Sequence, residues 1–310
     1  MSHHDWLWII FAVTVPVALA IDLGVVNRRA HEIRIREALV WSAFWITLAL
    51  AFNLLVWKWQ GSRAGLEFLT GYLVEKALSV DNLFVFLMVF SFFGVRPKLQ
   101  HKVLFWGIVG AVIMRGAFIY AGVTLIQSLH WIVYVLGAFL IVTGAKMALK
   151  KDDEVHPERN PVLKLFRRLM PVSEGYEGDR FFVKRAGRIM ATPLFIVVLV
   201  VETTDVVFAV DSIPAILGIT TDLLVVYTSN IFAILGLRAL FFALAGFMRL
   251  FHHLHYGLSL ILVFVGAKMI ASAWVKVPVG VALGAIAAIL VASVVTSILL
   301  PKKEPDIAGG

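Results

Sequence analysis

Residues 191–218 read ATPLFIVVLVVETTDVVFAVDSIPAILG, and this stretch decides the fold class of the chain. It is long enough to cross a bilayer, which takes about 20 mostly apolar residues. It nevertheless contains three carboxylates, at Glu202, Asp205 and Asp211. An acid at the centre of a membrane helix costs roughly 2.5–3.5 kcal/mol on insertion scales. An apolar span that retains three acids therefore predicts a membrane protein with a functional polar site.

Apolar blocks of similar length recur along the whole chain. The sequence is 60% hydrophobic and 15% charged, whereas soluble domains carry about 25% charged residues. We predict an all-α polytopic membrane protein with about nine transmembrane helices. The predicted spans are residues 6–26, 37–57, 66–94, 102–127, 131–149, 191–218, 221–247, 254–274 and 278–300.

The basic residues predict the orientation of these spans. The loops on one side hold twenty Lys and Arg residues, and the loops on the other side hold only Lys58, Arg63 and Lys276. Because cytoplasmic loops are enriched in Lys and Arg, the N-terminus is expected outside and the C-terminus in the cytoplasm. The net charge of +8 is explained by these loops, so we expect no nucleic-acid partner.

The chain contains two copies of one acidic pattern. Residues 75–83, EKALSVDNL, and 205–213, DVVFAVDSI, each place an acid six residues before an aspartate. Arg115 and Arg238 follow in mid-span, and Gly-Ala-Lys-Met then occurs at 144–147 and at 266–269. Each copy has three spans, an odd number, so the copies are predicted to be inverted, as is common in transporters.

This repeat divides the chain into five parts. They are two peripheral transmembrane helices (1–65), a first three-helix repeat (66–149), a cytoplasmic basic loop (150–190), a second, inverted three-helix repeat (191–274), and a last transmembrane helix with a cytoplasmic tail (275–310).

The acids inside the spans are the candidate functional residues. One alternative is that they are structural and form ion pairs, but two deep arginines could neutralise only two of them. Carboxylates with amide and hydroxyl oxygens form an environment that suits Mn²⁺, Mg²⁺ or Ca²⁺, and the chain has no cysteine to bind softer metals. The predicted metal ligands are Glu75, Asp81, Asn82, Glu202, Asp205, Asp211 and Ser212, with Arg115 and Arg238 as supporting ion pairs that orient the acids or replace the cation.

Helical geometry limits how these ligands can converge. Six residues advance a helix by 600°, so Glu75 and Asp81 point about 120° apart on a regular helix. Convergence would therefore require an unwound turn near Asp81–Asn82 and near Asp211–Ser212. Pro214 supports such a distortion in the second copy.

The loop 150–190 has two local patterns of its own. Leu163, Phe166 and Met170 predict the apolar face of a short amphipathic helix at the inner leaflet. Residues 181–183 and 189–191 are short apolar runs that flank the sequence KRAG, which predicts a small β-hairpin.

Two stretches resemble the signatures of a known family. Residues 71–82, GYLVEKALSVDN, and 202–214, ETTDVVFAVDSIP, look like the two signature stretches of the TerC family, and 229–238, SNIFAILGLR, matches it as well. The layout from about residue 20 to 300 looks most like the Alx branch, although Thr203-Thr204 departs from the family pattern. The resemblance implies a bacterial inner-membrane protein linked to Mn²⁺ export, with site roles for Glu75, Asp81, Glu202, Asp205 and Asp211.

The function we expect is Mn²⁺ export by alternating access, with proton exchange at a carboxylate site near the membrane midplane. The expected partners are Mn²⁺ as substrate, protons and membrane lipids, with no resident cofactor. The alternative is a TerC-type membrane scaffold that delivers metal to exported enzymes, or confers metal or tellurite resistance, without transport. The chain lacks a His-Glu-x-x-His motif and a nucleotide-binding loop, so we predict a secondary transporter and no enzyme activity.

Overall fold

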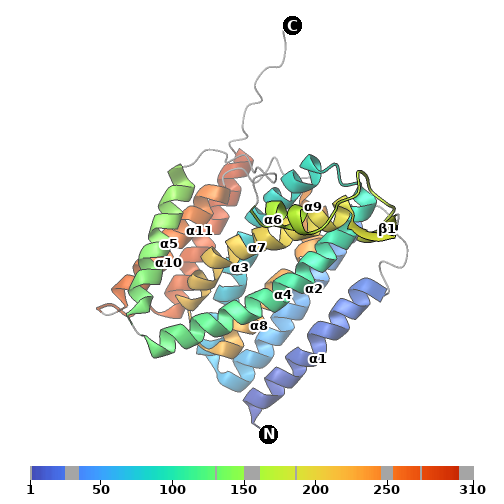
Figure 1. Cartoon of the computed structure of the whole chain (residues 1–310). Helices are drawn as coiled ribbons and strands as arrows, with labels where there is room; N and C mark the ends of the chain where they lie inside the picture. Colours follow the sequence, from blue (N-terminus) through green and yellow to red (C-terminus); the bar gives the residue numbers. More distant parts are fainter. Residues whose placement is uncertain are drawn as a thin grey trace.

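The computed structural model describes residues 2–24, 35–129, 131–149, 161–185, 187–245, 254–272 and 274–299 (Figure 1). The long helices lie side by side in one bundle, and the hairpin packs at its edge. The elements are α1 (His3–Gly24), α2 (Ile35–Gln60), α3 (Ser62–Phe92), α4 (Pro97–Ser128), α5 (Ile132–Leu149), α6 (Pro161–Leu169), β1 (Phe182–Arg185), β2 (Arg188–Ala191), α7 (Pro193–Leu217), α8 (Leu223–Leu235), α9 (Leu237–Ala245), α10 (Leu254–Ala271) and α11 (Val279–Leu299).

The prediction of an all-α polytopic membrane protein is confirmed. Eight segments of the described chain are long and apolar enough to cross a membrane: α1, α2, α4, α5, α7, α8 with α9, α10 and α11. The remaining predicted span, residues 66–94, corresponds to α3, which has 31 residues but carries five Asp, Glu, Lys or Arg residues. Helices α2, α7, α8, α9, α10 and α11 pack around α3 and bury Glu67, Glu75 and Asn82, whereas Arg63 at the start of the helix is exposed.

The structure has no helix break at either of the two predicted positions, and a break occurs at Gly236 instead. Helix α3 is continuous through Asp81–Asn82, and α7 is continuous through Asp211–Ser212. Pro214 lies in the last turn of α7, where the loss of one backbone hydrogen bond does not end the helix. The interruption in the described chain instead separates α8 from α9 at Gly236.

The break at Gly236 is stabilised by a cation from α3. The ammonium of Lys76 donates a 3.0 Å hydrogen bond to the carbonyl of Ala233, in the last turn of α8. The last carbonyls of a helix carry partial negative charge, which favours a cation there. A Cβ at Gly236 would lie 2.9 Å from that ammonium and 3.0 Å from the Cβ of Trp45, so a larger residue there would have to displace the Lys76 side chain.

Helices α5 and α10, the third helices of the two predicted repeats, pack at very short range. A Cβ at Gly144 would lie 2.7 Å from the carbonyl oxygen of Ser259, and one at Gly137 would lie 2.9 Å from that of Gly266. The shift that aligns Gly144 with Gly266 also aligns Gly137 with Ser259. Each contact therefore maps onto the other when the copies are exchanged, as a twofold relation would require. The inverted repeat itself stays a prediction.

Both predicted elements of the loop after α5 are confirmed. Helix α6 buries Leu163, and its Phe166 ring lies 5.3 Å from the ring of Phe195 on α7. Its apolar face therefore packs against protein, whereas we had predicted that this face would lie on the leaflet. Strands β1 and β2 pair antiparallel, with Lys184 opposite Ile189.

The α5–α10 contact yields a first prediction. Gly144→Ala should lower the free energy of unfolding by about 1–3 kcal/mol, because the added methyl group overlaps backbone of α10. Gly284→Ala on α11 is the matched control, since a Cβ there meets nothing within 4 Å. Thermal melting of the purified protein in detergent measures both variants. Equal melting temperatures would contradict the close packing of α5 on α10.

Candidate functional site

One arginine joins the acids of the two repeats. Arg115, on α4, donates through Nε and Nη2 to the two carboxylate oxygens of Asp205 on α7, at 3.2 and 3.1 Å. Its Nη1 donates to Glu75 on α3 and, at 3.1 Å, to the hydroxyl of Ser212 on α7. All five nitrogen-bound hydrogens of a guanidinium point outward in a planar fork, which suits this bidentate contact. Arg115 therefore holds the first helices of both repeats together.

Glu75 is bound from three helices. Besides Arg115, its carboxylate accepts a 2.9 Å hydrogen bond from the amide of Asn230 on α8, and the hydroxyl of Ser79 lies 3.4 Å away, one turn along α3. The repeat pattern singled out Glu75 and Arg115 but not Asn230 or Ser79. The signals for Asn230 were its place in the stretch 229–238 that matches the family and the polar run Thr228-Ser229-Asn230 inside a mostly apolar span.

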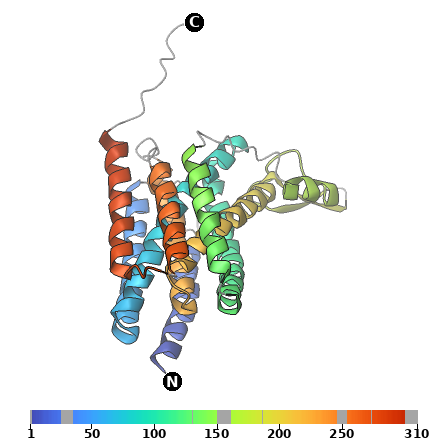
Figure 2. The same ribbon diagram turned by 90° about the vertical axis from the view of Figure 1, so that its left-hand side faces the viewer.

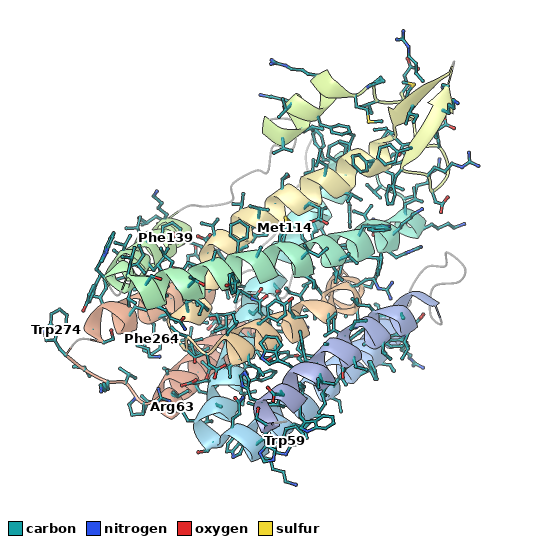
Figure 3. All side chains as sticks on the ribbon, turned by 60° about the horizontal axis from the view of Figure 1, so that its bottom comes forward. Trp59, Arg63, Met114, Phe139, Phe264 and Trp274 are labelled. Carbon is teal, nitrogen blue, oxygen red and sulfur yellow. The ribbon has the colours of Figure 1, made fainter. Side chains whose placement is uncertain are left out.

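This cluster is almost completely shielded from solvent. Glu75 and Asn230 are 0% exposed, Arg115 and Ser212 1%, and Asp205 5%. Buried charges attract each other strongly, but each of them has lost its hydration. The cluster is therefore stable only while every charged side chain keeps its partner. Met114, which is labelled in Figure 3, lies away from both ends of α4. Arg115 is the next residue of this helix, which runs from Pro97 to Ser128.

The cluster leaves one acceptor unused. The side-chain oxygen Oδ1 of Asn230 is buried and has no hydrogen-bond partner, although the amide nitrogen of the same group binds Glu75. Buried polar atoms are usually satisfied, so such an atom calls for an explanation. Placing the amide the other way round would set its oxygen against the carboxylate oxygen, which is repulsive.

The other predicted ligands lie elsewhere. Glu202 packs its carboxylate against Gly110 of α4, where a Cβ would overlap it, and its buried oxygen Oε2 has no hydrogen-bond partner. Asp211 is in hydrogen-bonding contact with Thr143 of α5. Asn82 is buried, and the side chain of Asp81 lies outside the described residues. Within the described part of the chain, no three His, Asp or Glu side chains are grouped closely enough to hold a metal ion.

The second predicted arginine borders a small cavity beside the cluster. Arg238, at the start of α9, and Asp205 line it together, and the remaining lining is apolar. That lining includes Phe86 from α3, Gly107 and Ala111 from α4, and Val201 from α7. The cavity therefore reaches Asp205 on the side where Arg238 lies.

The cluster leads to a second prediction. Arg115→Met should cost about 3–5 kcal/mol of stability, because Glu75 and Asp205 would be left buried and uncompensated. The neutral triple variant Arg115→Met, Glu75→Gln, Asp205→Asn should recover most of that loss. Arg185→Met is the control, since its ion pair with Glu177 is partly exposed and such pairs contribute about 0–1 kcal/mol. Thermal melting in detergent compares the variants, and a wild-type melting temperature for Arg115→Met would rule out an energetic role for the cluster.

Comparisons with known proteins place the chain in a family. The model of the family described as integral membrane protein TerC matches residues 60–305. A membrane protein of Myxococcus xanthus named STKORF319 is 48% identical over 96% of this chain and 94% of its own length. Proteins named "putative membrane-bound redox modulator Alx" are 46% identical in Salmonella typhi, over 93% of this chain and 92% of that protein, and 44% identical in Escherichia coli K12, over 98% of each.

No solved structure matches the chain. The family match covers the cluster from Glu75 to Asn230, and the matches to the relatives named Alx cover nearly the full length, as the resemblance of the two signature stretches had implied. The chain is a multi-pass integral membrane protein that belongs to the TerC family.

Proposed function

We propose that this protein is a Mn²⁺ exporter of the bacterial inner membrane, in which the transported cation takes the place of Arg115 between Glu75 and Asp205. The observation that carries the proposal is the buried cluster itself. It contains two carboxylates from the two halves of the chain and the hydroxyl of Ser212, all bound to the Arg115 guanidinium. Asn230, whose amide nitrogen binds Glu75, adds an unused oxygen next to that carboxylate.

The chemistry of this cluster fits a hard divalent cation. Mn²⁺, Mg²⁺ and Ca²⁺ prefer oxygen ligands, and carboxylate, hydroxyl and amide oxygens are the ones present. Arg115 supplies a single positive charge to two carboxylates, so a divalent ion would balance their charge more fully than the guanidinium does. The choice of Mn²⁺ among these ions follows the family resemblance.

Proton exchange is part of the proposal. Carboxylates that release a cation into water on one side must return through the membrane neutralised, by protons or by Arg115. Glu202, whose buried oxygen lacks a partner one helical turn from Asp205, is placed to carry such a proton. The N-terminus outside and the C-terminus in the cytoplasm would make the loop after α5 the cytoplasmic face.

Alternating access is supported by the way the two halves meet. The acids of the cluster come from α3 and α7, which are the equivalent helices of the two predicted repeats, and α5 and α10 meet through contacts that map onto each other. In inverted-repeat transporters, the substrate site lies between the repeats near the midplane. We propose that the cluster is the corresponding site in this chain.

The second candidate function is a membrane scaffold that supplies metal to other proteins. The name of the Alx relatives, which refers to redox modulation and not to transport, supports this candidate. This chain contains no cysteine, so a redox role would not run through thiols of its own. It would act through the metal that reaches other proteins.

Manganese flux is the third prediction. Purified protein in liposomes should move Mn²⁺ saturably. Asp205→Asn should reduce flux at limiting Mn²⁺ by at least about tenfold, because a ligand is lost while size is kept. Asn230→Ala should reduce it as well, since it removes the unused oxygen. Glu174→Gln, an exposed acid in the loop, is the control that should retain wild-type flux.

The same experiment separates the two candidates. Wild-type protein that binds Mn²⁺ without moving it across the bilayer would favour the scaffold. Flux that ignores a pH gradient would exclude proton exchange. Normal transport by Asp205→Asn would move the site away from the cluster.

A further inference from the structure

Helix α6 and the hairpin β1–β2 form a folded unit outside the bundle. We call the described residues 161–185 and 187–191 the α6–hairpin module. Figure 2 shows the module projecting sideways from the bundle, near the C-terminal ends of α5 and α11. A unit that projects sideways from a membrane bundle at that level meets the surface of the bilayer.

Side-chain contacts fix the module at one end of the bundle. The hydroxyl of Tyr176 donates a 2.7 Å hydrogen bond to the carbonyl of Phe93, just after α3. Lys102, near the start of α4, donates a 3.0 Å hydrogen bond to Asp179, which lowers the pKa of that carboxyl, and its ammonium lies 4.8 Å from the Phe181 ring. The module is therefore attached to α3, α4 and α7 at once.

The depth of the module is indicated by a tryptophan. The Trp106 ring on α4 is 47% exposed and lies 6.3 Å from the Phe181 ring, edge to face. Tryptophan rings of membrane proteins concentrate at the level of the lipid headgroups. The contact places the module at that level.

The free surface of the module combines apolar and basic side chains. Ile189 is 60% exposed, Leu165 58% and Phe182 44%. Lys184 lies directly opposite Ile189 in the hairpin, so the two side chains share one face. Further exposed basic side chains are Lys164, Arg168 and Arg188. Such a surface would be unfavourable in water but suits the boundary between acyl chains and anionic headgroups.

We propose that the α6–hairpin module binds the anionic phospholipid headgroups of the leaflet it touches. Ile189 and Leu165 enter the acyl region, while Lys164, Arg168 and Lys184 bind headgroup phosphates; Arg188 lies on the opposite face of the hairpin from Ile189. Each Lys or Arg near an anionic surface strengthens binding by about fivefold. Because only Thr192 separates β2 from α7, lipid contacts on the hairpin also hold the end of the helix that carries Asp205.

The test uses the absence of cysteine from the sequence. Ile189→Cys in the full chain is labelled with an environment-sensitive fluorophore and placed in nanodiscs whose lipids carry brominated acyl chains. We expect blue-shifted emission and strong quenching when phosphatidylglycerol is present, and weaker quenching in pure phosphatidylcholine. Adding Lys184→Gln and Lys164→Gln should reduce the dependence on phosphatidylglycerol by up to about fivefold per charge.

The control removes two exposed charges elsewhere. Lys58→Gln with Lys276→Gln should leave the quenching unchanged, since neither residue belongs to the module. Water-like emission in both lipids would overturn the proposal. Quenching that is the same with and without phosphatidylglycerol would overturn headgroup recognition. Reversal of the phosphatidylglycerol effect by inorganic phosphate would show a site for soluble anions instead.

Discussion

The structure depends on the placement of one guanidinium in the interior of the bundle. Arg115 cannot stay charged in an apolar interior without partners, and neither can Glu75 or Asp205. Their mutual contacts satisfy all three, but only if α3, α4 and α7 meet at one point, and Asn230 adds α8 to that meeting. The polar cluster thus fixes the relative positions of four helices that apolar packing alone would leave free to slide.

A cluster of this kind gives positional specificity more than stability. A buried ion pair loses in desolvation much of what it gains in attraction, although removal of one partner is costly. Under the proposed function, a divalent cation would replace the guanidinium on the same oxygens. Arg115 would then keep the site intact between transport events, and Asn230 Oδ1 is an acceptor that the guanidinium does not use.

The sequence predicted the spans and the identity of the central residues, but not how those residues are distributed in space. Hydropathy and charge located the helices, and the repeat singled out Glu75, Asp205 and Arg115. Helical periodicity predicts the direction of each side chain around its own helix. It does not predict which residue of a neighbouring helix that side chain contacts. For that reason the sequence could not show that Glu202 and Asp211 lie outside the cluster. Glu202 packs against Gly110, and Asp211 contacts Thr143. The break at Gly236 was missed because the Lys76 ammonium that binds the carbonyl of Ala233 beside it comes from α3, 157 residues away in the sequence.

The two arginines of the repeat occupy unequal surroundings, and this inequality bears on the mechanism. Arg115 bridges both acids, whereas Arg238 borders the cavity beside Asp205. If the two copies are inverted, as the sequence predicts, the proposed alternating access would exchange their environments. The exchanged arrangement would set Arg238 against the acids and open the cavity beside Arg115. In both arrangements, one arginine would then be bound to the carboxylates of Glu75 and Asp205. These carboxylates would be free to bind another cation only during the transition from one arrangement to the other. The cost of uncovering two buried acids would then make the conformational change depend on the ion or protons that replace the arginine.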